Sequence, residues 1–273
     1  DAEAVRSGLA GADAAIHGAA VYEVGIPASR RPAMYETNVA GTRTVLSAAL
    51  DARTPKVVYV STVAAFGDTK GAVVDETHEH PGRYTSYYDE TKHLAHQEAK
   101  RLVAAGLPCV VVQPGAVYGP KDHSVVGDQI RRAARGRLPA LAFPDMGLTA
   151  VHRDDVADGV LLALDSGRPG EAYVLGGEVT TLGTIVGTAA RVAGRRPPRL
   201  TVPAAFVRLV APLGPAVGPL LGYPPNMREL VSTSDGVTFW ATDAKARAEL
   251  GYAPRGLEDG LRDTLNAEGL LRS

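Results

Sequence analysis

The sequence has one cysteine, almost no excess charge of either sign and no long uninterrupted apolar run. Cys109 is the only cysteine among 273 residues, which excludes an internal disulfide and fits a reducing compartment such as the cytoplasm. The formal net charge is −1, and no basic stripe favours nucleic-acid binding. The most apolar stretch, 204–223, contains Arg208 and is interrupted by prolines and glycines, so we expect no membrane span. We expect packed helix there, and a segment that touches a membrane or covers the substrate is the alternative.

A recognisable set of metal ligands is also lacking. His78 and His80 lie two residues apart, and His93 and His96 lie three apart in an expected helix. A structural zinc site needs four convergent ligands and a catalytic one needs three, and no carboxylate–histidine spacing of a known kind frames these residues. We therefore expect no metal site.

Short apolar runs alternate with helical patterns along the chain. The 273 residues, 45% of them hydrophobic, can form one large domain or two smaller ones. The expected strands are 14–17, 57–61, 110–113, 149–152 and 171–175. The expected helices are 32–50, 87–106, 125–136, 153–166, 180–194 and 257–268. Strands separated by helices of this length predict an α/β fold with βαβ units and a doubly wound parallel sheet.

Tyr88 and Lys92 form the first pattern that carries chemistry. They lie four residues apart in the expected helix 87–106, so they share one helix face about one turn apart. A nearby ammonium group favours the phenolate and lowers the pKa of a tyrosine from its usual value near 10. Such a tyrosine can exchange a proton with a carbonyl or an alcohol oxygen near neutral pH. The spacing alone also suits an ordinary pair on a helix surface.

The strand before this helix strengthens the interpretation. The run VVYVSTVAAFG, residues 57–67, places Ser61 and Thr62 where a strand ends. Ligands of open α/β sheets bind at the carboxyl edge of the strands, so a hydroxyl there can donate to the substrate oxygen that Tyr88 serves. A turn or capping hydroxyl is the simpler alternative for these residue types.

Seven blocks in order give the chain a resemblance to a known family. It resembles the extended short-chain dehydrogenase/reductase family, also called the NAD-dependent epimerase/dehydratase family. The blocks are DAAIHGAA (13–20), NVAGTRTVLSAA (38–49), VVYVSTVAAFG (57–67), YYDETK (87–92), QPGAVYGP (113–120), VHRDDVADGV (151–160) and KARAELGY (245–252). Residues 170–178 and the tail are similar to dihydroflavonol-reductase-like members and to a hopanoid-associated sugar-epimerase-like group.

This resemblance implies a role for each matching residue. Thr62 matches the hydroxyl that binds the reacting oxygen, Tyr88 the acid/base, and Lys92 the lysine that holds the nicotinamide ribose and lowers the tyrosine pKa. Asn38 matches a helix residue that supports the site. The remaining matches, which line the cofactor after the fourth family strand and beside the nicotinamide ring, are Ala19, Ala20, Pro114, Gly115, Ala116 and Val117. The implied cofactor is NAD or NADP.

The family's glycine-rich loop and first two strands have no counterpart after Asp1. The opening residues, DAEAVRSGLAG, have the pattern of a helix without a preceding strand, so we expect that the protein is processed or that its start is absent from the sequence. Gly8, Gly11 and Ala14 have a similar spacing but follow a helix, so they fail the required strand–turn–helix context. The resemblance thus implies a truncated dinucleotide-binding Rossmann domain at 1–120. A smaller substrate-binding cap at 121–273 follows, with segments near 149–180 returning to the sheet domain.

Several other residues need an interpretation. Gln113 stands where many family members have arginine before the Pro-Gly pair. Asp154 and Asp155 are read as the acidic start of the helix 153–166, which suits its dipole, rather than as paired catalytic carboxylates. His152 is either a packed strand residue or faces the substrate cleft, and Tyr87 is either substrate-lining or structural.

Three functions follow, in order of preference. The first is an NAD(P)-dependent oxidoreductase that interconverts a hydroxyl and a carbonyl on a small molecule, with Thr62, Tyr88 and Lys92 as the site. The second is a nucleotide-sugar epimerase or dehydratase that uses the same site and regenerates its cofactor. The third is a non-catalytic binding module, which a truncated cofactor domain would favour. A homodimer through helices 32–50 and 87–106 is typical of the family.

Overall fold

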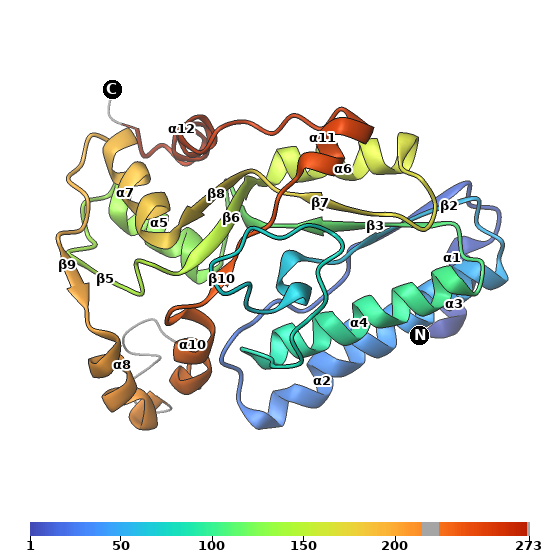
Figure 1. Ribbon diagram of the computed structural model, residues 1–273, viewed down its shortest axis with the longest axis horizontal. Helices are drawn as coiled ribbons and strands as arrows, with labels where there is room; N and C mark the ends of the chain where they lie inside the picture. The colour runs from blue at the N-terminus through green and yellow to red at the C-terminus, as the bar shows by residue number, and fades with distance from the viewer. Residues whose placement is uncertain (215–223, 272–273) are drawn as a thin grey trace.

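The computed structural model describes residues 1–214 and 224–271, and a four-stranded parallel sheet lies at its centre (Figure 1). The strand order is β1-β2-β3-β7. The bounds are Ala14–His17 for β1, Lys56–Val60 for β2, Cys109–Pro114 for β3 and Ala172–Leu175 for β7. Neighbouring strands pair in parallel, and helices lie between them in the chain. The predicted α/β fold with a doubly wound parallel sheet is confirmed.

Helices cover both faces of this sheet, as Figure 1 shows. On one face lie α1 (Ala2–Leu9), α3 (Gly41–Asp51) and α4 (Tyr87–Ala104), and on the other lie α6 (Arg153–Ser166) and α11 (Ala244–Leu250). Alternate residues of β3 therefore point into different cores. Val111 packs with Leu46 and Ala95 on the α3–α4 side, whereas Val112 packs with Ala163 on the α6 side.

Cys109 begins β3 and is fully buried in the core on the α3–α4 side. Burial raises the pKa of its thiol to about 12, because the charged thiolate is disfavoured away from water. A thiol in such an environment is unreactive while the sheet stays closed.

A second sheet extends from the carboxyl end of β3. Its strands are β4 (Ala116–Tyr118), β6 (Gly147–His152), β8 (Glu178–Thr181) and β10 (Thr238–Phe239), and a separate pair joins β5 (Ala140–Ala142) to β9 (Leu200–Val202). The helices α5 (Val125–Ala134), α7 (Leu182–Val192) and α12 (Leu257–Ala267) pack around it. At the end of this lobe nearest α4 lie α8 (Ala204–Val210), a 3₁₀ turn η4 (Ala211–Leu213) and α10 (Met227–Ser234) (Figure 1).

Gly115 joins the two sheets at a point of very close backbone approach. A Cβ atom at this position would lie 2.1 Å from the carbonyl oxygen of Thr149 in β6. The chain therefore passes directly from β3 into β4, and residues Ala116–Tyr118 pair in parallel with β6. This short strand was not among the expected strands, because it exists only through its pairing with β6.

Most expected elements are found within two or three residues of their predicted bounds, and α6 and β1 agree at both ends. The expected apolar helical stretch 204–223 forms α8 and η4 over its first part, and residues 215–223 lie outside the described residues. Within residues 1–214 and 224–271, no helix is both long enough and apolar enough to cross a membrane.

Candidate active site

Helix α4 places Tyr88 and Lys92 against the carboxyl end of β2. Ser86 begins the helix as its N-cap, and its Oγ accepts a hydrogen bond from the Asp89 amide at 3.1 Å. The side chains of Tyr88 and Lys92 are both buried. Lys92 Nζ donates to the carbonyl oxygen of Val60, the last residue of β2, at 3.2 Å.

Thr62 lies two residues beyond β2 and meets Tyr88 there. Its hydroxyl accepts a hydrogen bond from the Ala64 amide at 3.2 Å, which caps the 3₁₀ turn η3 (Val63–Phe66). It also lies 3.4 Å from the carbonyl oxygen of Pro114 at the end of β3. Burial raises the pKa of Tyr88, and the nearby Thr62 hydroxyl partly opposes this rise, so the two hydroxyls are close. The structure therefore brings Thr62, Tyr88 and Lys92 together at one edge of the sheet.

Burial controls the protonation of this site. It raises the pKa of Tyr88 well above 10, and nearby Tyr22 and Asp89 raise it further. Burial also lowers the pKa of Lys92 to about 8. The desolvation of the phenolate dominates the pKa of Tyr88 here, and the expectation that Lys92 lowers this pKa stays a prediction. Tyr88 is a neutral phenol at neutral pH and can act as a proton donor.

Asn38 connects the loop after β1 to helix α4. It lies in a π-helical turn, Glu36–Ala40, between α2 (Arg31–Tyr35) and α3. Such turns within helices are frequent at functional sites. Its side chain accepts from the Val21 amide at 2.7 Å and donates to the Val21 carbonyl oxygen and to Thr91 Oγ1, both at 3.0 Å. With both its oxygen and its nitrogen engaged and its side chain buried, Asn38 fixes this loop to the helix that carries Tyr88.

The loop that Asn38 holds borders the same edge of the sheet. Ala19 and Ala20 follow β1 and are exposed. Tyr22 is exposed too, and its ring packs edge-on against the ring of Tyr88, with 4.9 Å between their centroids. Val117, at the other side of the site, is 41% exposed. These segments leave small side chains and backbone accessible beside Tyr88.

Comparison with known proteins identifies the family. A model of the NAD dependent epimerase/dehydratase family matches residues 1–176, which is more than half of the chain. The chain belongs to this family. The prediction from the ordered motifs is confirmed, and the family's characterised members are enzymes.

Two relatives and one solved structure show how similar the chain is to known family members. A Synechocystis sp. protein provisionally named dihydroflavonol 4-reductase is 32% identical, over 86% of this chain and 71% of its own. The 4-hydroxy-2-methyl-3-oxo-4-farnesyl-3,4-dihydroquinoline-1-oxide ketoreductase of Stigmatella aurantiaca is 30% identical, over 98% and 80%. A double mutant of the dTDP-glucose 4,6-dehydratase DesIV from Streptomyces venezuelae, solved with NAD, has a TM-score of 0.75 at 25% identity. It is matched over 98% of this chain and 77% of its own.

Other polar residues considered from the sequence have structural contacts. His152 is buried, and its Nδ1 accepts a hydrogen bond from the Asp154 amide at 3.3 Å, so it caps α6 and does not face a cleft. Asp155 is buried and pairs with Arg255, and Asp154 is exposed and pairs with Arg153. Both aspartates lie in the first turn of α6, as expected.

The four histidines considered as metal ligands lie around the turn η3 and do not converge on one possible metal position. His80 and His93 have ring centroids 4.3 Å apart, and His93 Nδ1 lies 3.2 Å from the carbonyl oxygen of Ala65. His96 Nδ1 shares a hydrogen bond with Ser61 Oγ at 3.1 Å. In the part of the chain that the structure describes, no group of three or more His, Cys, Asp or Glu side chains is placed to hold a metal ion.

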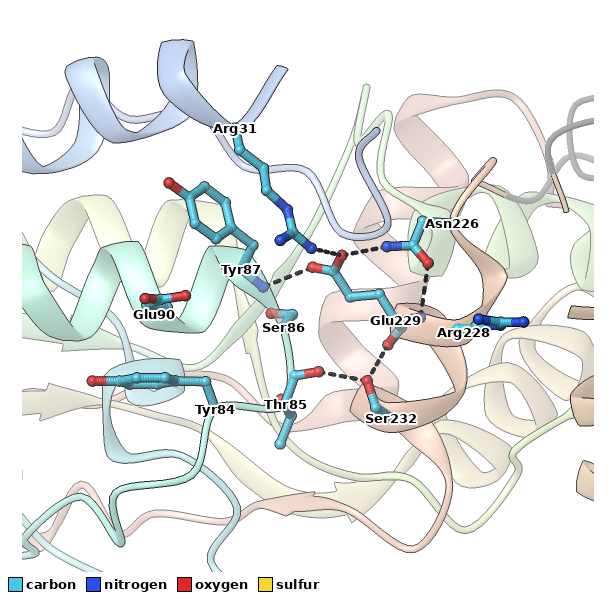
Figure 2. A pocket seen from close by; sticks show the side chains of 10 residues that line it. All are labelled: Arg31, Tyr84, Thr85, Ser86, Tyr87, Glu90, Asn226, Arg228, Glu229 and Ser232. Atoms are coloured by element: carbon cyan, nitrogen blue, oxygen red, sulfur yellow. Dashed lines mark hydrogen bonds and ion pairs between the residues drawn. The ribbon is translucent and has the colours of Figure 1, made fainter. Parts of the chain in front are cut away.

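A small cavity next to the start of α4 contains a residue that sequence reasoning missed. The cavity has a volume of about 330 Å³ and lies between the first turn of α4 and helix α10 (Figure 2). Glu229 of α10 enters it and is almost fully buried. The one sequence signal was the Asn226-x-x-Glu229 spacing, which is typical of a helix start and predicts only a local cap.

Proposed function

We propose that the chain interconverts a hydroxyl and a carbonyl group of a small-molecule substrate by hydride transfer with NAD or NADP. The supporting observation is the meeting of Tyr88, Thr62 and Lys92 at the carboxyl end of β2, where open α/β sheets bind their ligands. In the direction of reduction, Tyr88 gives its proton to the carbonyl oxygen, and Thr62 donates a hydrogen bond to the same oxygen. In the direction of oxidation, both roles reverse.

The protonation states of the buried residues are compatible with the reductive direction. Tyr88 is a neutral phenol at neutral pH, as an ordinary tyrosine is, and burial raises its pKa further, so it holds the proton that it would donate. Lys92, with a pKa lowered to about 8, carries its charge over most of the neutral range. Together these residues supply the proton and a positive charge beside the oxygen on which negative charge develops.

The residues around Tyr88 fit a nicotinamide dinucleotide, which supplies or accepts the hydride when bound. The Lys92 ammonium has three N–H donors, and one of them is engaged by the Val60 carbonyl oxygen. The remaining donors would hold the ribose hydroxyls. The exposed backbone of Ala19 and Ala20 would line the cofactor, and Pro114 to Val117 would lie beside the nicotinamide ring. Asn38 would contribute to cofactor binding by fixing the loop after β1 that borders the cofactor.

A nucleotide-sugar epimerase or dehydratase is the second candidate, supported by the likeness to the dTDP-glucose 4,6-dehydratase of Streptomyces venezuelae. The same residues would then oxidise and re-reduce one sugar, so the cofactor would be regenerated within each turnover. A ketoreductase changes the nicotinamide absorbance in step with product formation, whereas an epimerase or dehydratase forms product without a net change. The 30% identity to a ketoreductase that acts on a farnesylated dihydroquinoline oxide supports the first candidate.

The test compares Tyr88→Phe with Tyr87→Phe. The second variant removes a hydroxyl from the adjacent tyrosine, whose ring lies under the Arg31 guanidinium at 5.0 Å. The assay offers NADH and NADPH with a 2-alkyl-3-oxo ester, a dihydroflavonol and UDP-glucose, and follows both nicotinamide absorbance and product. Tyr88→Phe should lower kcat by about 100-fold or more, since general acid catalysis is worth 10²–10⁴-fold. Unchanged turnover in Tyr88→Phe would contradict the proposed role.

A further inference from the structure

Helix α10, which comes from the distant C-terminal part of the sequence, contacts the first turn of α4 through Glu229. Figure 2 shows the Glu229 side chain directed at the backbone of Tyr87. Its Oε1 accepts a hydrogen bond from the Tyr87 amide at 2.7 Å, and its Oε2 accepts one from Asn226 Nδ2 at 2.9 Å. Arg31 lies 3.7 Å from the same carboxylate. The glutamate is 7% exposed, so its two oxygens meet protein donors rather than bulk water.

The Tyr87 amide needs such a partner. It is the first residue of α4, and the first amides of a helix have no acceptor within the helix. The Ser86 hydroxyl accepts from the amide of Asp89, three residues further on, and leaves the amide of Tyr87 to Glu229. A carboxylate is a strong acceptor for a backbone amide and also suits the positive end of the helix dipole. Tyr88, the proposed proton donor, is the next residue.

Helix α10 also fixes the backbone next to the hydrogen bond between Glu229 and the Tyr87 amide. The hydroxyls of Ser232 and Thr233 donate to the carbonyl oxygen of Thr85 at 2.6 and 3.1 Å. Thr85 and Tyr87 flank the Ser86 cap, so α10 fixes the backbone immediately before and at the first turn of α4. Three polar contacts within three residues define where this turn begins.

Helix α10 also reaches the loop that covers Tyr88 from the other side. The Asn226 amide donates to the carbonyl oxygen of Gly25 at 3.0 Å. Gly25 has a φ of 77°, which glycine adopts readily, and a Cβ there would lie 2.6 Å from Pro224. This loop contains Tyr22, whose ring packs on Tyr88. The start of α10 thus contacts both backbone segments that set the surroundings of the Tyr88 ring.

We propose that Glu229 is a positioning residue for Tyr88. Through the Tyr87 amide it fixes the first turn of α4, and so it sets the direction of the phenol that serves the substrate oxygen. The catalytic part of this inference rests on the proposed function. A displacement of a catalytic group by about 1 Å can cost on the order of 100-fold in rate, so the loss of this one contact would be visible in turnover.

The first experiment measures the geometry without substrate. Amide hydrogen exchange of the full chain is compared for the natural protein, Glu229→Ala, Glu229→Gln and Glu90→Ala. Glu90 is the matched control, because it is a glutamate that lines the same cavity and its carboxylate accepts no hydrogen bond from the residues drawn around it. Exchange at the Tyr87 amide should become about tenfold faster in Glu229→Ala, since its acceptor is lost. Glu229→Gln keeps one acceptor oxygen and should lie between, and Glu90→Ala should match the natural protein.

The second experiment measures kcat, KM for the cofactor and the solvent deuterium isotope effect on kcat. In Glu229→Ala, kcat should fall by about tenfold or more with the cofactor KM within about twofold, and the isotope effect should rise because proton transfer becomes slower. A purely structural loss would reduce the active fraction and leave the isotope effect unchanged. Glu229→Gln should recover part of kcat, and it also keeps the test open if Glu229→Ala does not fold.

The outcomes separate this inference from the proposed function. The positioning role would be overturned if the Tyr87 amide exchanged as slowly in both Glu229 variants as in the natural protein. It would also be overturned if kcat fell while the solvent isotope effect stayed unchanged. If Tyr88→Phe keeps full turnover, the proposed function fails, although the exchange result at Tyr87 still reports on the contact itself. If Tyr88→Phe is inactive and the Glu229 variants turn over like the natural protein, only the inference about Glu229 fails.

Discussion

Lys92 combines a positive charge with a nearly complete loss of contact with water. Its pKa falls from 10.5 to about 8 on burial, which means that folding disfavours the charged form. Between these two values the unfolded chain binds more protons than the folded protein, so the free energy of unfolding rises with pH in this window. The catalytic role proposed for Lys92 and the stability of the fold therefore require opposite protonation states of its side chain.

At the residue scale, we predict that Lys92→Met loses activity and removes this pH dependence. The natural protein should gain roughly 1–3 kcal/mol of stability relative to the variant as the pH rises from about 8 toward 10, because one pKa unit corresponds to about 1.4 kcal/mol. Urea unfolding of both proteins across this range measures the difference. Curves that stay parallel with pH would show that the burial of Lys92 carries no such cost. Above pH 10 the buried tyrosines also contribute, so the comparison ends there.

At the scale of secondary-structure elements, the junction of β3 and β4 depends on a missing side chain. Gly115→Ala would place a Cβ 2.1 Å from the Thr149 carbonyl oxygen, which is backbone and cannot move aside freely. We predict a loss of about 2 kcal/mol in the free energy of unfolding. Gly8→Ala is the matched control, since its Cβ would meet nothing within 4 Å and it lies in helix α1. That change should be neutral or stabilising by up to about 1 kcal/mol.

Equal effects of the two glycine changes on chemical denaturation would contradict the role given to the junction.

The secondary-structure elements also show what sequence patterns can and cannot predict. Helix α6 was predicted at both ends because its acidic first turn and apolar face are local signals. The short strands β4, β8 and β10 have no such local signal, since each has two to four residues and exists through pairing with β6.

The candidate site divides in the same way. Tyr88 and Lys92 were found from spacing on one helix, and Thr62 from the end of a strand, because these signals lie within a few residues of one another. Glu229 could not be found, because 142 residues separate it from the Tyr87 amide that it binds. The raised pKa of Tyr88 was also beyond reach, since it depends on burial by segments whose packing the sequence does not display.

At the scale of the whole molecule, the C-terminal segment that runs from α11 into α12 is tied to helix α6 by an ion pair whose carboxylate is buried. The Arg255 guanidinium contacts both carboxylate oxygens of Asp155, at 2.9 and 3.1 Å from Nε, and Asp155 is 7% exposed. Removing Asp155 takes away the buried acceptor of both the Arg255 guanidinium and the Arg255 amide, and leaves the guanidinium with Asp263 alone. We predict that Asp155→Ala lowers the free energy of unfolding by about 2–3 kcal/mol.

Asp154→Ala is the control for this prediction, because Asp154 begins the same helix and is 55% exposed. Its removal should cost no more than about 1 kcal/mol, as for other exposed ion pairs. Thermal unfolding followed by calorimetry also reports cooperativity. A single transition that shifts as a whole in Asp155→Ala is expected, because α6 and the C-terminal segment share one core with β7. Two separate transitions would contradict this.

The buried position of Cys109 at the start of β3 determines how the folded protein can be labelled at cysteine. Its thiol is enclosed by the sheet and two helices, and its thiolate is strongly disfavoured, so alkylating reagents reach it only when the sheet opens. A cysteine introduced on an exposed helix face would therefore be the one reactive thiol of the folded chain, and a dye or spin label could be attached to it without replacing the native residue. Because Cys109 is enclosed in this way, the rate at which it is modified would report how often the central sheet opens.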